Sequence, residues 1–292
     1  KYNKDNHDVG FMINCSFGNK YRLLGDTSCI DIITTTARSL STRYRSAVGC
    51  TRSWSHPGTL HWQFPVIIDN MMNLELLCRA TELSGDKRFY DMAISHADKT
   101  MANHFRPDYS CYHVVNYDTI SGNALQKCTW QGYADKSVWS RGQSWALYGY
   151  TMMYRETKQP RYLEQAKHIA GFLLNHPKMP QDKIPYWDFD DPDIPNALRD
   201  ASAAAIMASA LLELSGYVDE ATGQGYVAVA ETQLRTLASD EYLAKPGENT
   251  NFILKHSVGF LPQDSEVDVP LTYADYYFVE ALMRYRAMCL KE

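Results

Sequence analysis

Ala201-Ser202-Ala203-Ala204-Ala205-Ile206-Met207-Ala208-Ser209-Ala210 is the stretch that decides the fold class. It consists almost entirely of small or apolar residues and carries no charged face. A helix that is apolar all round is buried on all sides. The stretch therefore predicts an inner helix of an all-α protein, as in the inner ring of a closed helical toroid.

The rest of the chain repeats one pattern: a long amphipathic helix, a tight turn, and a second helix that begins near a tyrosine. In each pair, either a glycine caps the end of the first helix or a proline lies in the first turn of the second helix. The pattern predicts helices at 8–23, 28–45, 66–84, 87–105, 137–157, 160–175, 198–216, 219–238 and 271–289. Extended segments rich in aromatic and polar residues are expected at 49–64, 108–134, 178–196 and 250–268.

Equivalent turns recur at about 60 to 70 residues, which corresponds to a helical hairpin and a long loop. Tetratricopeptide and ankyrin arrays repeat at about 33 residues with short loops, so a scaffold solenoid fits poorly. Long loops at one end of a helical array are where functional sites are built. No Ser/Gly/Pro-rich linker or charge run divides the chain, so we expect a single domain over residues 1–292.

The composition narrows the classes of partner. The chain has 292 residues, 45% of them hydrophobic, and a formal net charge of −5, which argues against nucleic acid as a ligand. No apolar run is long enough to span a membrane. The seven cysteines lack zinc-ligand spacing, so we expect mostly buried thiols, no metal and no cofactor. The chain starts without Met or a signal peptide, which indicates a fragment or a processed form; localisation and oligomeric state are not predicted.

A second informative stretch is Trp139-Ser140-Arg141-Gly142-Gln143-Ser144-Trp145-Ala146-Leu147-Tyr148-Gly149-Tyr150. Its helical spacing puts Arg141, Trp145 and Tyr148 on one face. A guanidinium can grip a carboxylate with two hydrogen bonds, and aromatic rings can stack on a sugar. The face therefore suits a flat anionic ligand. The alternative is an ordinary amphipathic helix with a solvated arginine and a core tryptophan.

Two aspartates are candidate catalytic acids. Asp69 lies in Phe64-Pro65-Val66-Ile67-Ile68-Asp69-Asn70-Met71-Met72, in the first turn of an expected helix with apolar neighbours. Desolvation would raise the pKa of its carboxyl group, whereas the helix N-terminus opposes this. Asp8 also precedes an expected helix. For both, the alternative is a helix-capping carboxylate.

Other polar and aromatic residues in the loops are weaker candidates. His113 alternates with apolar residues and is expected on a strand beside a cleft, although a lone histidine is commonly structural. Trp54, Trp130 and Trp187 fit sugar platforms or packing over helix ends equally well. No Walker loop, dinucleotide fingerprint, nucleophile elbow or Cys/His dyad is present, which leaves carboxylate chemistry on a carbohydrate.

Taken together, the ordered motifs resemble glycoside hydrolase family 88, the unsaturated glucuronyl hydrolases. They run from His7-Asp8-Val9-Gly10-Phe11 to Tyr273-Ala274-Asp275-Tyr276-Tyr277. The most specific pieces between them are Asp69-Asn70-Met71, Gly132-Tyr133-Ala134-Asp135, Ser140-Arg141-Gly142-Gln143-Ser144-Trp145, Ile184-Pro185-Tyr186-Trp187-Asp188-Phe189-Asp190 and Arg199-Asp200-Ala201-Ser202-Ala203.

The resemblance implies an (α/α)6 toroid of twelve helices, of which the pattern here accounts for about nine. The single domain is therefore expected to be incomplete at its N-terminus. The implied reaction is hydration of a 4,5-unsaturated uronic acid at the non-reducing end of oligosaccharides that polysaccharide lyases produce. Asp69 matches the family's general acid/base, and Asp8 matches its second essential carboxylate. The residues that match the subsite of the unsaturated ring are Trp54, His113, Gln131, Arg141 and Trp145.

One motif departs from the family. Members that prefer sulfated glycosaminoglycan disaccharides carry a Ser-x-x-Ser-x-Lys run, and the local match here, Ser257-Val258-Gly259-Phe260-Leu261-Pro262, keeps only the first serine. The parent polysaccharide therefore stays open. The alternatives are an unsaturated rhamnogalacturonyl hydrolase or a catalytically silent, uronate-binding toroid, and the presence of both Asp8 and Asp69 argues against the silent protein.

Overall fold

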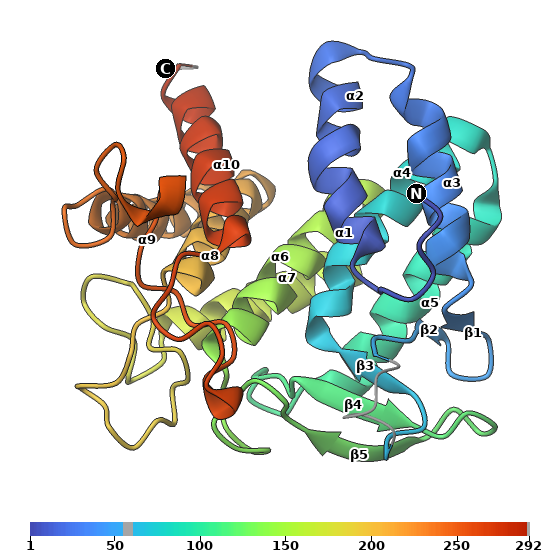
Figure 1. The fold of residues 1–292 in the computed structure, drawn as a ribbon, viewed down its shortest axis with the longest axis horizontal. Helices are drawn as coiled ribbons and strands as arrows, with labels where there is room; N and C mark the ends of the chain where they lie inside the picture. Colours follow the sequence, from blue (N-terminus) through green and yellow to red (C-terminus); the bar gives the residue numbers. More distant parts are fainter. Residues whose placement is uncertain (55–60, 291–292) are drawn as a thin grey trace. The chain divides into compact units, whose positions relative to one another are not determined.

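A computed structural model describes residues 1–54 and 61–290 (Figure 1). Its internal contacts define two compact units. The first unit comprises Lys1–Phe105, His113–Cys128 and Met152–Gln159. The second unit comprises Arg106–Tyr112, Thr129–Thr151 and Pro160–Glu292.

The first unit is built mainly from helices. They are α1 (Val9–Ile13), a π-helical turn (Asn14–Gly18), α2 (Asn19–Leu24), α3 (Cys29–Ser41), α4 (Leu74–Ser84) and α5 (Lys87–His104). Gly85 ends α4 in the left-handed conformation, with φ of 73°. The Asp86 side chain then begins α5 by accepting a hydrogen bond from the Arg88 amide. This confirms the hairpin turn expected between these two helices.

A small antiparallel sheet completes the first unit and corrects one expectation. Its strands are β3 (Pro65–Ile67), β4 (Val114–Tyr117) and β5 (Ala124–Cys128), in the order β3-β4-β5; a short ribbon joins β1 (Tyr44–Arg45) and β2 (Cys50–Thr51). The helix expected from residue 66 begins only at Leu74. Residues Pro65–Ile67 pair with β4 instead, and a 3-10 helix, Ile68–Asn73, follows.

The core beneath the sheet explains this difference. Val66 packs in a buried cluster with Val48, Cys50, Phe64, Val115 and Tyr117. β-branched residues fit a pleated surface that is covered by such neighbours. Burial against distant residues therefore overrides the local helical pattern.

The second unit contains the long C-terminal helices. They are α7 (Pro160–Leu174), α8 (Ala201–Leu214), α9 (Glu220–Leu237) and α10 (Thr272–Cys289); α6 (Ser140–Thr157) contributes residues to both units. In α8 every residue from Ala201 to Leu212 is buried. The inner helix predicted from its small residues is confirmed.

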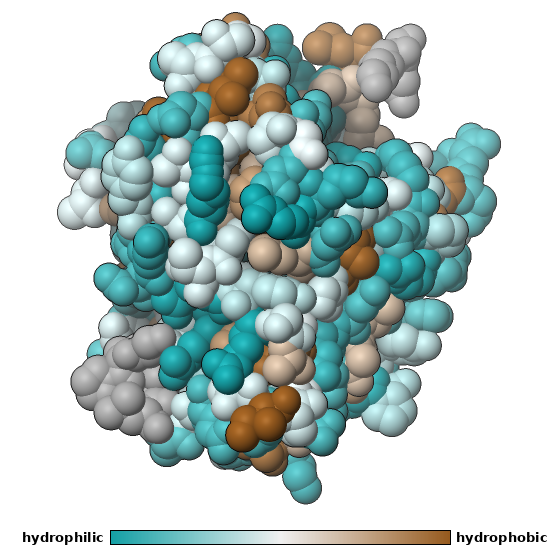
Figure 2. Space-filling view, turned by 90° about the vertical axis from the view of Figure 1, so that its right-hand side faces the viewer, coloured by the Kyte–Doolittle hydropathy of each residue, from teal (hydrophilic) through white to brown (hydrophobic). Residues whose placement is uncertain are grey.

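The surface seen in Figure 2 is mostly hydrophilic and most cysteines are buried, as the amino-acid composition predicts. Hydrophobic residues form separate small patches on that face. Five of the cysteines are buried thiols: Cys29, Cys50, Cys78, Cys111 and Cys128. Among the described helices, none is long and apolar enough to cross a membrane.

Candidate active site

Asp69 and His113 meet where two paired strands end. Asp69 lies in the first turn of the 3-10 helix that follows β3, and His113 immediately precedes β4. The Ile68 amide donates to the His113 carbonyl oxygen at 2.9 Å. Asp69 Oδ2 lies 3.7 Å from His113 Nε2, and the two side chains are 18% and 1% exposed. Strand pairing therefore brings a shielded carboxyl group to a buried imidazole.

Asp8 forms a similar pair with its neighbour in the chain. It occupies the N-cap position of α1, but its side chain makes no capping hydrogen bond there. Asp8 Oδ1 lies 3.4 Å from His7 Nε2, and 42% of the Asp8 side chain is exposed. Burial lowers the pKa of His7, and the Asp8 charge opposes this shift. Capping therefore does not account for Asp8.

Trp54 links the two aspartate–histidine pairs. Its ring centre lies 5.8 Å from that of His113 and 6.3 Å from that of His7, with both contacts edge-on. Trp62 stacks on Trp54 with ring centres 5.9 Å apart. Sequence reasoning missed His7 and Trp62 as members of this cluster. Only the adjacency of His7 to Asp8 could have pointed to the former.

Two further hydrogen bonds hold this cluster together. The Phe11 amide in α1 donates to Asn73 Oδ1 at 2.8 Å, at the end of the 3-10 helix that carries Asp69. Gly10 lies so close that an added Cβ would stand 2.8 Å from the same oxygen. Asn70 Nδ2 also donates to the Thr51 carbonyl oxygen at 2.9 Å, three residues before Trp54. The elements that carry Asp8, Trp54 and Asp69 are thus fastened to one another.

In the second unit, Arg141 lies in an internal ion pair. It is 2% exposed, so the interpretation of this residue as a solvated arginine is wrong. Its Nη1 lies 3.1 Å from Asp200 Oδ2, and its Nη2 donates to the Gly259 carbonyl oxygen at 2.7 Å. A short contact also joins Nη1 to the Val258 carbonyl oxygen. Gln131 Nε2 donates to the same Gly259 oxygen at 3.0 Å.

The aromatic residues near Arg141 are packed together. Trp145 is 4% exposed and contacts Tyr273 and Tyr277 edge-on, as the packing interpretation expected. Tyr148, on the same helical face, donates to Glu280 at 3.0 Å. The loop residue Trp187 is also buried and donates to Asp191.

The structure thus places the sequence-derived candidates in two sets. The first unit brings together Asp8, Trp54, Asp69 and His113. The second unit brings together Gln131, Arg141 and Trp145. Across the described part of the chain, no group of three His, Cys, Asp or Glu side chains could hold a metal ion.

Comparisons with known proteins point to one enzyme family. The model of Glycosyl Hydrolase Family 88 matches residues 1–285. An unsaturated glucuronyl hydrolase of Formosa agariphila is 49% identical over 100% of this chain and 72% of its own length. An unsaturated chondroitin disaccharide hydrolase of Streptococcus agalactiae is 32% identical over 96% of this chain and 70% of its own length.

Solved structures agree with this assignment. The crystal structure of an unsaturated glucuronyl hydrolase specific for heparin matches with a TM-score of 0.95 and 55% identity, over 99% of this chain and 76% of that one. The unsaturated glucuronyl hydrolase from Bacillus sp. GL1 matches with a TM-score of 0.90 and 33% identity, over 97% of this chain and 74% of that one. Enzymes of this type are helical toroids, so the fold class expected from the sequence is confirmed.

Proposed function

The chain belongs to glycoside hydrolase family 88, and from this premise we propose that Asp69 and Asp8 carry its reaction. The protein is a hydrolase of the unsaturated glucuronyl hydrolase type. Its substrate is a small saccharide with a 4,5-unsaturated uronic acid at the non-reducing end. The observation that carries the assignment of roles is the linked arrangement in which Trp54 contacts His7 and His113, each beside one aspartate.

The reaction is hydration of a vinyl ether. A proton adds to C4 of the unsaturated ring, and the positive charge that develops at C5 is shared with the ring oxygen. Water adds at C5 and returns a proton to the enzyme. The resulting hemiketal opens to a ketone, and the hemiacetal left at C1 then releases the rest of the saccharide.

Asp69 is the general acid in this proposal. Its carboxyl group is largely shielded from water, and burial disfavours the charged form of a carboxyl group. The acid can therefore carry the proton that C4 receives. After that transfer the carboxylate can accept the proton lost by the attacking water, so one residue serves both steps.

Asp8 is the second essential carboxylate. It is more exposed than Asp69, and the buried His7 lies at its side. A carboxylate at this position can stabilise positive charge that develops on the substrate. The hydrogen bond from the Phe11 amide to Asn73 Oδ1 supports a fixed relation between this carboxylate and Asp69.

Trp54 and His113 are proposed as substrate-binding residues of the first unit, and Gln131, Arg141 and Trp145 as substrate-binding residues of the second unit. Gln131 and Arg141 share the Gly259 carbonyl oxygen, so both donors are held in place before a ligand arrives. Preorganised donors bind a carboxylate at a lower entropic cost. The aromatic neighbours of Trp145 fix its ring in the same way.

The test is turnover by Asp69→Asn. The amide is a neutral isostere that cannot deliver a proton, so the rate should fall by at least about a thousandfold while the fold is retained. Asp5→Asn, which changes an exposed aspartate of the same unit, is the matched control. The assay follows loss of the double bond in unsaturated disaccharides of chondroitin, heparin, hyaluronan and rhamnogalacturonan. An Asp69→Asn variant within about tenfold of the parent rate contradicts the assignment.

Isotope labelling tests the reaction type separately. Since protonation occurs at carbon, the anomeric centre is not attacked directly, and the rule that relates carboxylate separation to retention or inversion does not apply. In heavy-oxygen water the label should enter at C5. Label at C1 of the uronate without label at C5, or rapid hydrolysis of a saturated aryl glucuronide, contradicts the vinyl ether route.

A further inference from the structure

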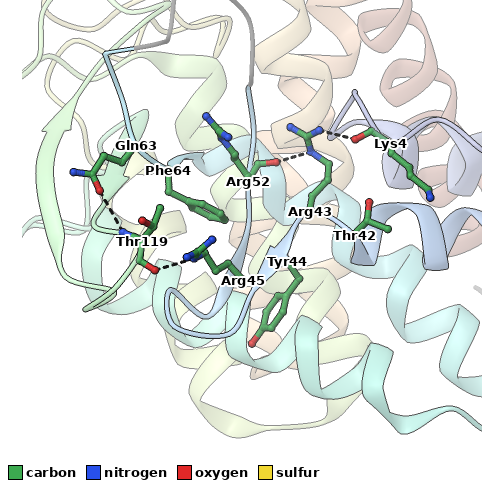
Figure 3. A pocket seen from close by; sticks show the side chains of 9 residues that line it. All are labelled: Lys4, Thr42, Arg43, Tyr44, Arg45, Arg52, Gln63, Phe64 and Thr119. Atoms are coloured by element: carbon green, nitrogen blue, oxygen red, sulfur yellow. Dashed lines mark hydrogen bonds between the residues drawn. The ribbon is translucent and has the colours of Figure 1, made fainter.

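A cavity of about 300 Å³ lies in the first unit, outside the cluster of Asp8, Trp54, Asp69 and His113 (Figure 3). This volume is at the lower end of the range for small-molecule sites. The residues that line it are Lys4, Thr42, Arg43, Tyr44, Arg45, Arg52, Gln63, Phe64 and Thr119. Four of them are cations, and none of these described lining residues is acidic.

Arg43 forms part of the wall of the cavity. Its Nε donates to the Arg52 carbonyl oxygen at 2.8 Å, its Nη1 to that of Lys4 at 2.7 Å and its Nη2 to that of Ser53 at 2.6 Å. Burial lowers the pKa of the Arg43 guanidinium, and the charge of Arg52 lowers it further. Asp5 and Asp8 act in the opposite sense, but less strongly. The cavity therefore holds a positive charge that its own walls do not neutralise.

Arg52 and Arg45 supply the donors that a ligand could use. Arg52 Nε is buried, and no described residue accepts a hydrogen bond from it. Arg45 Nε donates to the Thr119 carbonyl oxygen at 2.8 Å, which fixes the base of that guanidinium. Figure 3 shows that Arg45 lies beside Thr119 and Phe64. A buried donor without an acceptor costs free energy, which a bound anion would remove.

We propose that this cavity is a second anion site, which takes a sulfate or carboxylate group of an acidic saccharide. Guanidinium groups match such oxyanions through paired hydrogen bonds, and Lys4 adds a point charge. The site is distinct from the Ser257–Pro262 run. In that run Ser257 is buried, and Phe260 packs against Trp130 with ring centres 5.8 Å apart.

The anion has two possible sources. Arg52 lies two residues before Trp54, so their Cα atoms are within about 7 Å. A sulfate at the far end of a saccharide stacked on Trp54 could therefore reach Arg52, and for this source the inference rests on the proposed function. The other source is a separate acidic saccharide that is not turned over.

The direct test is calorimetric binding of a saturated, sulfated oligosaccharide by the full chain. Arg52→Gln should weaken binding about tenfold, the effect of losing a charge-assisted hydrogen bond. Arg38→Gln, which removes an exposed arginine of the same unit on α3, is the matched control. Equal affinities of Arg52→Gln and Arg38→Gln overturn the proposal.

Kinetics distinguish the two sources. If the anion belongs to the substrate, Arg52→Gln should raise KM more for a sulfated than for an unsulfated unsaturated disaccharide. If it belongs to a separate saccharide, the calorimetric affinity should fall while both KM values change equally. The calorimetric measurement does not depend on turnover. It therefore tests the anion site even if the proposed catalytic function is wrong.

A stability control guards against misfolding. Loss of Arg52 relieves its repulsion of Arg43, so the thermal midpoint of Arg52→Gln should not lie below that of Arg38→Gln. Should Arg52→Gln misfold, Arg45→Gln provides the second variant. It should weaken binding in the same assay, and unchanged affinity in that variant also overturns the proposal.

Discussion

Asp200 performs two structural tasks with its two carboxylate oxygens. Its Oδ2 pairs with the Arg141 guanidinium at 3.1 Å. Its Oδ1 begins α8 by accepting from the Ser202 amide at 3.0 Å and the Ala203 amide at 3.4 Å. The fully buried Asp200 therefore couples the start of the inner helix to the arginine that we propose to line the substrate subsite.

The first residue-scale prediction concerns Asp200→Ala. The change removes a helix cap and leaves the Arg141 charge buried without the carboxylate that balances it. Breaking a buried pair in this way costs about 3–5 kcal/mol of the free energy of unfolding. Asp219→Ala is the control, because Asp219 caps α9 at the surface, and its loss should cost only about 1 kcal/mol. Urea unfolding measures both values, and equal losses would mean that the ion pair adds nothing.

The second residue-scale prediction concerns Gly259→Ala. An added Cβ would lie 2.5 Å from Glu266 Cβ, so the segment must shift. That shift would move the carbonyl oxygen to which both Arg141 and Gln131 donate. We expect KM for the unsaturated disaccharide to rise at least about fivefold, with a smaller change in kcat. Gly225→Ala on α9, where an added Cβ meets nothing, is the control, and a matching KM in both variants would contradict the role of this carbonyl.

Arg141 also shows what the sequence could and could not predict at this scale. Its helical spacing from Trp145 and Tyr148 correctly placed the three residues on one helix, α6. Its burial and its partners were not predictable, because Asp200, Val258 and Gly259 lie far away in the chain. Local spacing carries no information about such distant contacts.

At the scale of elements, the sequence was most reliable for long amphipathic helices. The expected helix at 87–105 is α5, Lys87–His104, and that at 160–175 is α7, Pro160–Leu174. The expectation failed at Asp69, where a strand and a 3-10 helix replace the start of a helix. Pairing with β4 decided that segment, and strand pairing is a non-local interaction that periodicity does not record.

The prediction for α8 follows from its burial on all sides. Ala205→Leu adds a branched side chain where no residue of the helix face is exposed, and such overpacking costs about 1–3 kcal/mol. Ala228→Leu places the same group at an exposed position of α9 and should change the free energy of unfolding by less than about 0.5 kcal/mol. Urea unfolding compares the two variants. If Ala205→Leu leaves the free energy of unfolding unchanged, the packing around α8 has space for a larger side chain.

At the scale of the whole molecule, the family assignment came from the order of the motifs, since no single motif is specific. The comparisons confirm that assignment and the helical toroid. The expectation of one domain over residues 1–292 stays a prediction. The site also illustrates the limit of sequence reasoning, because Asp8, Asp69, Trp54 and His113 were predicted as site residues, whereas His7 and the ring contacts that link the two aspartate–histidine pairs required coordinates.

Two buried histidines of the first unit, His96 and His104, take no part in the proposed reaction. His96 Nδ1 accepts a hydrogen bond from the Thr51 amide at 3.1 Å, which requires the neutral ring. His104 Nε2 donates to the Val66 carbonyl oxygen at 3.1 Å. Burial lowers the pKa of His96 to about 3 and that of His104 to about 4, from an ordinary value of 6.5. Both residues are fully buried in the first unit.

The resulting prediction is a loss of stability in mild acid. Below pH 6.5, His96 and His104 bind protons in the unfolded chain but stay neutral in the folded chain. Their contribution to the free energy of unfolding is therefore complete above that pH and declines as the pH falls toward 4. Each histidine should lower the free energy of unfolding by about 2 kcal/mol between about pH 7 and about pH 5. His104→Gln keeps a donor for the Val66 carbonyl oxygen but cannot titrate, so its pH dependence in urea unfolding should be smaller by that amount. His168→Gln, an exposed change on α7, should retain the full dependence of the parent. If His104→Gln and the parent lose stability equally, protonation of other groups governs unfolding in acid.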